Sequence, residues 1–288
     1  MKIYINGKFY PKEEAKVSVF DHGYLYGDGI YETLRAYGGM VFEMDAHIRR
    51  LNRSAEAMFM RLPLDDNGIY KAVNDTLNEN GLKDAYVRVS VSRGPGEIGL
   101  DPELCPEPTF VIIAKPFVDY PPEMHEKGVK VSVVKTRRNH PECLDPAIKS
   151  TNFLNNIFAK IEAKAAGAFE GIMLNHSGFV AEGTISNVFM VKDGAVLTPP
   201  LIAGILEGVT RDLIIRLAES AGVEVFEEPF TETQMWHADE VFITNTTMEV
   251  MPVTDVDGHK VKDGLPGEIT RRLKDAYSSE VERCLKAR

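Results

Sequence analysis

The chain has 288 residues, of which 44% are apolar and 26% are charged, a composition typical of a globular protein long enough for two domains. Its net charge of -10 argues against nucleic acid or an anionic membrane surface as its main partner. Three cysteines at unrelated spacings fit neither a disulfide framework nor a metal cluster, and neither an apolar signal core nor a membrane-spanning run occurs, so a cytoplasmic location is expected.

The first part of the chain is predicted to combine strands and helices. Residues 1–44 read as strands and begin with a hairpin at Asn6-Gly7, a dipeptide that favours type I′ turns. Helices are expected from Asp45, as an N-cap, and over about 67–79. Arg50 lies beside the apolar stripe of the first helix, where an arginine is usually a surface group with a buried stem.

The segment 86–92 alternates between valines and polar residues, which predicts a strand with two different faces. The three valines fix one face in a core, so Tyr86 and Arg88 lie on the opposite face. That polar face either meets solvent or lines a cavity. The apolar run 109–114 predicts a buried strand next in the chain.

Paired prolines in 117–127 stop both helix and sheet, so this segment is the best candidate for an interdomain linker. The sequence thus predicts an N-terminal α/β domain over 1–116 and a C-terminal α/β domain over 128–288. Strands of the second domain are expected at 129–134, 171–174, 188–191, 223–226 and 241–244, and helices from Thr210 and from about Pro266.

Lys149 precedes a predicted helix in the middle of the chain, which Ser150 or Thr151 can cap. A lysine just outside a helix N-terminus, next to a packed face, has its pKa lowered by the helix dipole and by desolvation. Schiff-base chemistry needs such a neutral amine, although a lysine before a helix is most often a solvated surface group. The apolar residues expected on the packed face of this helix are Phe153, Leu154, Ile157, Phe158 and Ile161.

Four other pieces supply complementary chemistry. Glu182 follows a strand, where a buried carboxylate needs a cationic or proton-donating partner. The glycine-rich turn 204–212 leads onto a helix N-terminus, and 241–247 ends a strand in threonines and an asparagine, so both suit an anion. Arg50 could supply the counter-charge. Each piece alone reads more simply as a surface acid, a helix cap or a polar turn; together they provide the amine, the pyridinium partner and the phosphate cup that pyridoxal 5′-phosphate requires.

Several sequence blocks occur in a fixed order along the chain, among them YGDGIYETLRAY, HIRRL, AYVRVSVSRG, AIKSTN, AEGTISNVF and GVTRD. On these blocks the chain resembles the class IV, or fold type IV, pyridoxal-phosphate aminotransferases, and it is most similar to the branched-chain amino acid aminotransferases. The resemblance implies an α+β fold with two α/β domains and the cofactor at the domain interface. It also implies a homodimer or a higher homo-oligomer.

The resemblance assigns roles to individual residues. Lys149 would bind the cofactor covalently and shuttle a proton, and Glu182 would pair with the pyridine nitrogen. The other cofactor-binding residues would be Arg50, Phe153, Leu206, Val209, Thr210 and Thr246, and no metal is expected. The substrate-binding residues would be Tyr26, Tyr31, Thr33, Arg35, Tyr86, Arg88, Thr247 and, from the other subunit, Leu100, with the backbone amides of 246–247 taking the α-carboxylate.

Three departures from the branched-chain pattern leave the substrate open. Phe153 stands where a tyrosine is common, Thr33 replaces a usual glycine, and Ile185-Ser186 differs from the commoner Gly-Asp or Gly-Glu pair. The first hypothesis is transfer of the amino group of leucine, isoleucine or valine to 2-oxoglutarate, so that small amino acids and 2-oxo acids are the partners. The alternatives are a D-amino acid aminotransferase or a 4-amino-4-deoxychorismate lyase of the same fold, and a non-catalytic protein.

Overall fold

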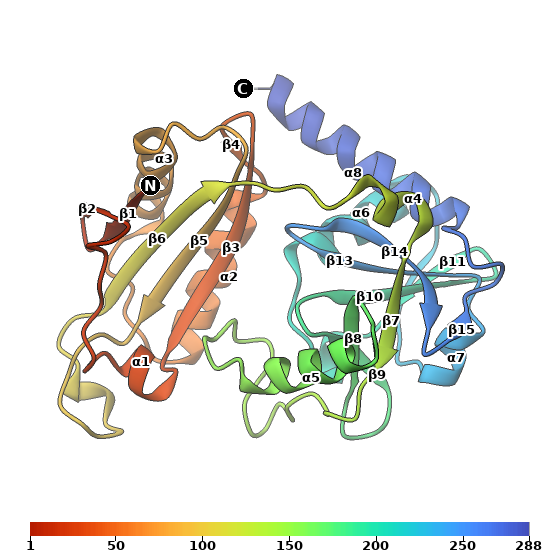
Figure 1. Cartoon of the computed structure of the whole chain (residues 1–288), viewed down its shortest axis with the longest axis horizontal. Helices are drawn as coiled ribbons and strands as arrows, with labels where there is room; N and C mark the ends of the chain where they lie inside the picture. The colour runs from red at the N-terminus through yellow and green to blue at the C-terminus, as the bar shows by residue number, and fades with distance from the viewer. Residues whose placement is uncertain (288) are drawn as a thin grey trace. The chain divides into compact units, whose positions relative to one another are not determined.

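The computed structural model describes residues 1–287 (Figure 1). The contacts between Cα atoms divide the chain into two compact units. The first unit comprises Met1–Val118, Ile148–Asn152 and the C-terminal end from Cys284, and the second comprises Asp119–Ala147 and Phe153–Arg283. The short segment that carries Lys149 therefore belongs to the first unit, although the residues on both sides of it belong to the second.

A six-stranded antiparallel sheet forms the first unit, in the strand order β2-β1-β6-β5-β3-β4. The first two strands make the predicted hairpin, in which Asn6 and Gly7 have positive φ values of 46° and 87°, as a type I′ turn requires. The strands are β1 (Lys2–Ile5), β2 (Lys8–Pro11), β3 (Gly29–Tyr37), β4 (Met40–Val41), β5 (Ala85–Ser92) and β6 (Thr109–Pro116).

Two helices, α2 (Met44–Ala57) and α3 (Asp66–Glu79), pack with the apolar face of this sheet into one core (Figure 1). The three valines of β5 are buried in that core and the residues between them are half-buried, so the predicted alternation is confirmed. The polar face of β5 therefore points away from the helices.

Two details of the predicted first part are wrong. Residues 22–26 form a short helix, α1 (His22–Tyr26), in place of a strand, because the Asp21 carboxylate accepts a hydrogen bond from the Gly23 N–H and caps the turn. The helix α2 begins two residues earlier than expected, because its N-cap is Glu43, so Asp45 lies in its first turn.

A nine-stranded sheet forms the second unit, in the order β12-β11-β10-β13-β14-β7-β8-β9, with β15 paired to β14. All five predicted strands occur in it, and the mixture of helices and sheets confirms the α+β class. The strands are β7 (Val129–Val133), β8 (Glu170–Leu174), β9 (Val180–Gly183), β10 (Asn187–Lys192), β11 (Ala195–Thr198), β12 (Val225–Glu227), β13 (Glu240–Asn245), β14 (Glu249–Val256) and β15 (His259–Lys260).

The remaining α-helices are α4 (Pro122–Lys127), α5 (Leu154–Ala165), α6 (Val209–Ser220), α7 (Glu232–Trp236) and α8 (Glu268–Lys286), and 3-10 turns occur at η1 (Pro102–Leu104) and η2 (Leu201–Ala203). Paired prolines were expected to keep helices out of 117–127, yet α4 begins at Pro122. A proline in the first helical turn loses no hydrogen bond and already has a helical φ. None of the helices within residues 1–287 is long and apolar enough to cross a membrane.

The helix α5 buries the face opposite to the predicted one. Its buried residues are Asn156, Ala159 and Ala163. A Cβ on Gly171 of β8 would lie only 3.1 Å from the Ala163 Cβ, so helix and sheet approach closely and only small side chains fit between them. The large apolar residues on the other face, each between 49% and 59% exposed, are Leu154, Ile157, Phe158 and Ile161.

Candidate active site

Lys149 lies in an extended segment that pairs with one edge of β3. The Tyr31 N–H donates to the Lys149 carbonyl at 3.0 Å, and the Thr151 N–H donates to the Gly29 carbonyl at 2.8 Å. On the side of α2, the Lys149 N–H donates to Ser54 Oγ at 3.2 Å. We call residues 148–151 the lysine strap; its backbone is fixed from two directions by the first unit.

Neither Ser150 nor Thr151 caps α5, contrary to the prediction. That helix begins at Leu154, and within residues 1–287 no side chain caps its N-terminus. The Thr151 hydroxyl donates instead to the Gly27 carbonyl at 2.9 Å. Lys149 therefore does not lie at a helix N-terminus, and its expected contact with a helix dipole is wrong.

The ring of Tyr31 carries two cationic side chains. Lys149 Nζ lies 4.6 Å from the ring centroid, and Arg88 Cζ lies 3.8 Å from it. Burial raises the pKa of the Tyr31 phenol well above its ordinary range, and Arg88 opposes this only in part. The phenol thus stays neutral, and its ring brings an amine and a guanidinium to the same side chain.

The strands β3 and β5 align other predicted substrate residues on the polar face of the first sheet. Thr33 lies opposite Arg88 in the strand register. The Arg88 Nε donates to Ser90 Oγ at 3.1 Å, which fixes the plane of the guanidinium. The structure therefore brings Tyr31, Thr33 and Arg88 together with Lys149.

Arg35 and Tyr86 form a second group farther along the same strands, where they lie opposite each other. The Arg35 guanidinium is buried and stacks on Phe117, with its Cζ 3.2 Å from the ring centroid. The Tyr86 ring receives Lys115 Nζ at 5.0 Å. Both residues are therefore held by cation–π contacts at the end of the polar face.

Leu100 lies in the loop between β5 and β6, and this loop contacts Tyr26 at the end of α1. The Gly99 N–H donates to the Tyr26 hydroxyl at 3.2 Å, which ties α1 to the loop just before Leu100. Leu100 itself is 84% exposed, so its side chain is covered by little of its own chain.

Arg50 belongs to a buried cluster and is not the surface group that its sequence context suggests. Its Nε and Nη2 donate to the two carboxylate oxygens of Glu32, each at 2.7 Å, and Glu32 Oε2 lies 2.8 Å from His47 Nδ1. Burial alone would raise the pKa of Glu32, but Arg50 and His47 lower it well below its ordinary range. Burial lowers the pKa of His47 in spite of Glu32, so this imidazole is neutral at pH 7.

Glu182, in the second unit, is buried and has three donors. Its Oε1 accepts from Arg138 Nε at 2.6 Å, and its Oε2 accepts from the Leu206 N–H at 2.9 Å and from Asn187 Nδ2 at 3.5 Å. The protein thus supplies a cation for this acid from its own chain. Arg138 is in turn fixed by Asn155, whose Oδ1 accepts from its Nη1 at 3.2 Å.

The N-terminus of α6 is suited to an anion. No side chain within residues 1–287 caps it, and its first two residues, Val209 and Thr210, are buried. A Cβ on Gly208 would lie 2.0 Å from Asn187 Oδ1, so only glycine allows this approach. Asn187 lies opposite Thr244 in the sheet, and the Thr244 hydroxyl is buried with no hydrogen-bond partner in the described part of the chain.

These two features fit a phosphorylated pyridine. A buried carboxylate held by fixed donors suits a protonated ring nitrogen, and an uncapped helix N-terminus near a buried hydroxyl lacking a partner suits a phosphate. The residues of the second unit therefore fit pyridoxal 5′-phosphate. Across residues 1–287 no group of three or more histidine, cysteine, aspartate or glutamate side chains could hold a metal ion.

The turn after β13 is closed by one asparagine. Asn245 Oδ1 accepts from the N–H groups of Thr247 and Met248, each at 2.8 Å, and Asn245 Nδ2 donates to the Ile185 carbonyl at 3.1 Å. The Thr247 amide is therefore already engaged within the turn that the resemblance assigns to the substrate carboxylate. Phe153, the residue before α5, brings no hydroxyl to the site.

Four polar residues around the candidate site were not predicted from the sequence. Glu32, His47 and Arg138 were visible only as parts of longer sequence blocks, which are YGDGIYETLRAY, HIRRL and RRNHPE. His47 and Ser54 are buried on α2 together with Arg50. Their spacing of three and four residues along one helix face was the available signal, because a polar stripe inside an apolar helix needs partners.

Comparisons with known proteins agree with this geometry. The family described as amino-transferase class IV matches residues 29–256. A Methanocaldococcus jannaschii protein, provisionally named branched-chain-amino-acid aminotransferase, is 47% identical over 277 residues, which cover 96% of this chain and 95% of that protein. The D-alanine aminotransferase of Bacillus licheniformis is 34% identical and covers 98% of this chain and 97% of its own.

A solved structure shares the fold over nearly the whole chain. It is the crystal structure of the T.th. branched-chain amino acid aminotransferase with pyridoxamine 5′-phosphate. The two structures have a TM-score of 0.92 and 33% sequence identity, and the match covers 96% of this chain and 92% of that chain.

The Glu32 cluster predicts a pH-dependent loss of stability. The folded pKa of Glu32 lies below its unfolded value, so its contribution is complete above about pH 4.3 and is lost as the pH falls further. Glu32→Gln should reduce the free energy of unfolding at pH 7 by about 3–5 kcal/mol, because the Arg50 guanidinium remains buried and loses the Glu32 carboxylate. Urea unfolding should show the difference from wild type shrinking below about pH 4.

The matched control is Asp75→Asn, which removes one partner of an exposed ion pair with Lys71 on α3 and should leave the stability nearly unchanged. A difference between wild type and Glu32→Gln that stays constant from pH 7 to pH 3 would contradict the expected ionisation of Glu32.

Proposed function

The chain belongs to the class IV aminotransferases, and from this premise we propose that it transfers the amino group of branched-chain L-amino acids to 2-oxoglutarate with pyridoxal 5′-phosphate. The observation that carries the proposal is the ring of Tyr31, which holds Lys149 Nζ at 4.6 Å and Arg88 Cζ at 3.8 Å. A reactive amine and a carboxylate-binding guanidinium thus lie within one side chain of each other. A dual-substrate enzyme needs both, since 2-oxoglutarate carries a second carboxylate and leucine does not.

The cofactor, when bound, supplies an electron sink for the substrate carbanion. Lys149 Nζ would anchor it and carry the proton at the substrate α-carbon. Glu182, which accepts from Arg138 Nε at 2.6 Å, would pair with the pyridine nitrogen and hold a proton on it. The other residues proposed to hold it are Arg50, Val209, Thr210 and Thr246 at the phosphate, and Leu206 and Phe153 along the ring.

The proposed substrate residues form two groups, one around the Tyr31 ring that contacts Lys149 and one farther from it. Tyr31, Thr33 and Arg88 are proposed to contact the substrate side chain directly, and Arg35, Tyr86 and Tyr26 are proposed to wall the pocket. The Thr247 N–H donates to Asn245 Oδ1 in this structure. It would therefore bind the substrate α-carboxylate only after the Asn245 side chain has rotated away.

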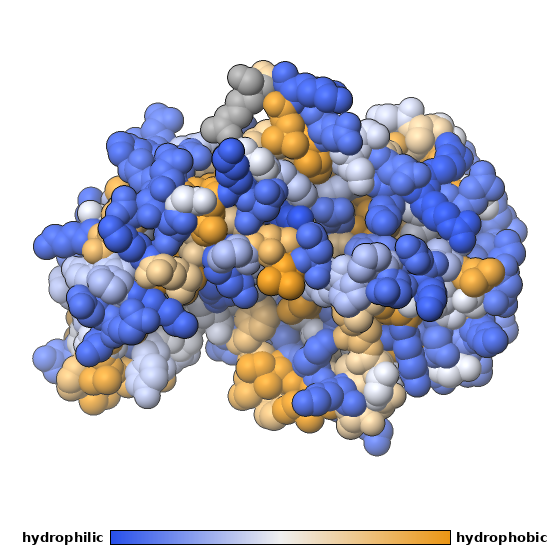
Figure 2. Space-filling model, turned by 45° about the horizontal axis from the view of Figure 1, so that its top comes forward, coloured by the Kyte–Doolittle hydropathy of each residue, from blue (hydrophilic) through white to orange (hydrophobic). Residues whose placement is uncertain are grey.

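We propose that the chain acts as a homodimer in which Leu100 enters the partner's site. Two sets of exposed apolar residues support this: those on the outer face of α5, and Phe20, Tyr24, Ile98 and Leu100 of the first unit. Figure 2 shows apolar surface gathered in patches within a mostly hydrophilic face. Such patches are unusual on a monomer.

We also propose domains over 1–116 and 128–288, joined by 117–127, and a cytoplasmic location. Cys105 and Cys143 are free thiols, as a reducing compartment would keep them.

Lys149→Ala should abolish transamination while leaving the far-ultraviolet circular dichroism unchanged, since the variant loses the proposed anchoring amine and none of the strap's backbone hydrogen bonds. Borohydride reduction of the wild-type holoenzyme, followed by peptide mapping, should place the cofactor on Lys149. The control Lys160→Ala, on α5, should retain wild-type activity. A label on another lysine, or turnover by Lys149→Ala, would contradict the assignment.

The substrate is tested by a panel of L- and D-amino acids with 2-oxoglutarate, scored for stereochemistry, in wild type and in Arg88→Leu. Wild type should use L-leucine, L-isoleucine and L-valine. Arg88→Leu should lower kcat/KM for 2-oxoglutarate about ten- to a hundredfold, since a charge-assisted hydrogen bond is worth roughly 1.5–3 kcal/mol, and leave kcat/KM for L-leucine nearly unchanged.

The control Arg61→Leu removes an exposed arginine of the same unit and should change neither value. Equal losses for leucine and 2-oxoglutarate would refute the dual pocket. A wild type that uses only D-alanine would support the D-amino acid aminotransferase, and release of pyruvate from aminodeoxychorismate would support the lyase.

The dimer is tested by sedimentation. Wild type should sediment at twice the chain mass of 32.1 kDa. Phe158→Asp should shift the equilibrium toward the monomer at micromolar concentration, because it places a charge in the outer face of α5. Phe59→Asp changes a residue that is 92% exposed on the first unit and serves as the control. A wild type that sediments as a monomer would contradict the proposed homodimer.

A further inference from the structure

The helix α2 carries a buried polar stripe along one side. His47, Arg50 and Ser54 are 2%, 4% and 2% exposed, in a helix whose other buried residues are mainly apolar. Two polar partners face the stripe: His47 and Arg50 share Glu32, and Ser54 faces the lysine strap. The stripe therefore joins one helix to both β3 and Lys149.

Ser54 makes a single contact that matters for the site. Its Oγ accepts the Lys149 N–H at 3.2 Å, while the Lys149 carbonyl accepts the Tyr31 N–H at 3.0 Å. The two peptide groups that flank the Lys149 Cα are thus held by two different elements. The backbone bonds to Tyr31 and Gly29 join the strap only to the edge of β3, about which it could still pivot. The bond to Ser54 holds it from the side of α2 as well.

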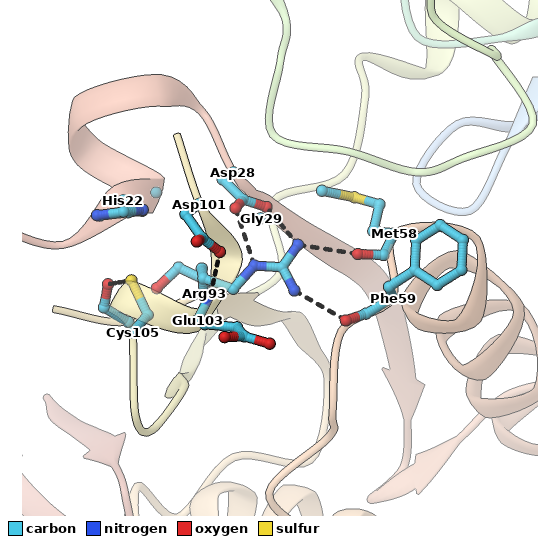
Figure 3. A network of polar contacts seen from close by, with 12 residues as sticks. His22, Asp28, Gly29, Met58, Phe59, Arg93, Asp101, Glu103 and Cys105 are labelled. Carbon is cyan, nitrogen blue, oxygen red and sulfur yellow. Dashed lines mark hydrogen bonds and ion pairs between the residues drawn. The ribbon is translucent and has the colours of Figure 1, made fainter. Parts of the chain in front are cut away.

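Arg93 connects the residue before β3 with the two residues after α2, and Figure 3 shows its contacts with Asp28, Met58 and Phe59. Its guanidinium donates to both Asp28 carboxylate oxygens, at 2.9 and 3.1 Å, and to the carbonyls of Met58 and Phe59, each at 2.9 Å. Asp28 precedes Gly29, which pairs with the strap, and the Met58 N–H bonds to the Ser54 carbonyl at 3.2 Å. Arg93 therefore holds the start of β3 and the end of α2, the two elements that bond the strap, at a fixed distance from each other.

We propose that Ser54 is a positioning residue for Lys149: by accepting the lysine's backbone N–H, it fixes where the amine lies relative to Arg50. This rests on the proposed function, in which Lys149 anchors the cofactor and Arg50 holds its phosphate. Arg50 and Ser54 are four residues apart on one helix, about 6 Å along its axis. One rigid helix thus sets the spacing of the two anchor points.

The test compares Ser54→Ala, Ser54→Thr and the control Thr76→Val. Thr76 is another fully buried helix hydroxyl of the first unit, bonded to the Ala72 carbonyl on α3. Ser54→Ala should lower kcat for L-leucine about tenfold, with KM changed less than twofold, and should shift the pH midpoint of the holoenzyme's visible absorbance. Ser54→Thr keeps the acceptor and should restore kcat to within about threefold of wild type. Thr76→Val should leave both readouts unchanged.

A second readout needs no cofactor. In the cofactor-free protein, hydrogen exchange of the Lys149 amide should be at least tenfold faster in Ser54→Ala than in wild type, and unchanged in Thr76→Val. Unchanged exchange, or a kcat of Ser54→Ala within twofold of an active wild type, overturns the positioning role. A wild type without any transaminase activity overturns the proposed function instead, so the two failures are distinguishable.

Discussion

The free edge of β3 is the constraint on which the arrangement of the first unit depends. The strand β4 pairs with β3 only at Ala36 and Tyr37, so the edge at residues 29–31 would leave its backbone groups without partners. The lysine strap fills this edge with the Tyr31–Lys149 and Thr151–Gly29 hydrogen bonds. Completing a sheet and placing a reactive amine are thereby one and the same event.

Buried charges concentrate where the two units carry their proposed anchors. Glu32 with Arg50 lies in the first unit, and Glu182 with Arg138 lies in the second. Buried ion pairs seldom contribute net stability, because the desolvation of both ions offsets their attraction. The proposed function gives them a reason: the Glu32 pair orients the guanidinium proposed to bind a phosphate, and the Arg138 pair orients the carboxylate proposed to meet a protonated ring.

Local features of the fold could be predicted from the sequence, whereas long-range ones could not. The turn at Asn6-Gly7 and the alternation of 86–92 depend on neighbouring residues alone. The sequence of α5 also shows an amphipathic pattern, but the pattern does not determine which face of the helix is buried. The buried face carries alanines because α5 packs closely against Gly171, where larger side chains do not fit. Likewise the burial of Arg50 depends on Glu32, eighteen positions away on another element. The resemblance implies residue roles, but it does not name the partners, such as Arg138 and Ser54, that contact those residues.

The position of the strap in the sequence also affects how the first unit folds. Thr151 and Gly29, which it joins, are separated by 122 positions in the chain. Closing a loop of that length reduces the conformational entropy of the chain, and the hydrogen bonds of the strap must offset this loss. Contacts between residues so far apart in sequence also slow folding. The hairpin of β1 and β2 and the packing of α2 on β3 involve far shorter separations. We therefore expect the strap to pair with β3 after that hairpin and the packing of α2 have formed. A nascent chain cannot place the Lys149 amine until residues 148–151 have been synthesised.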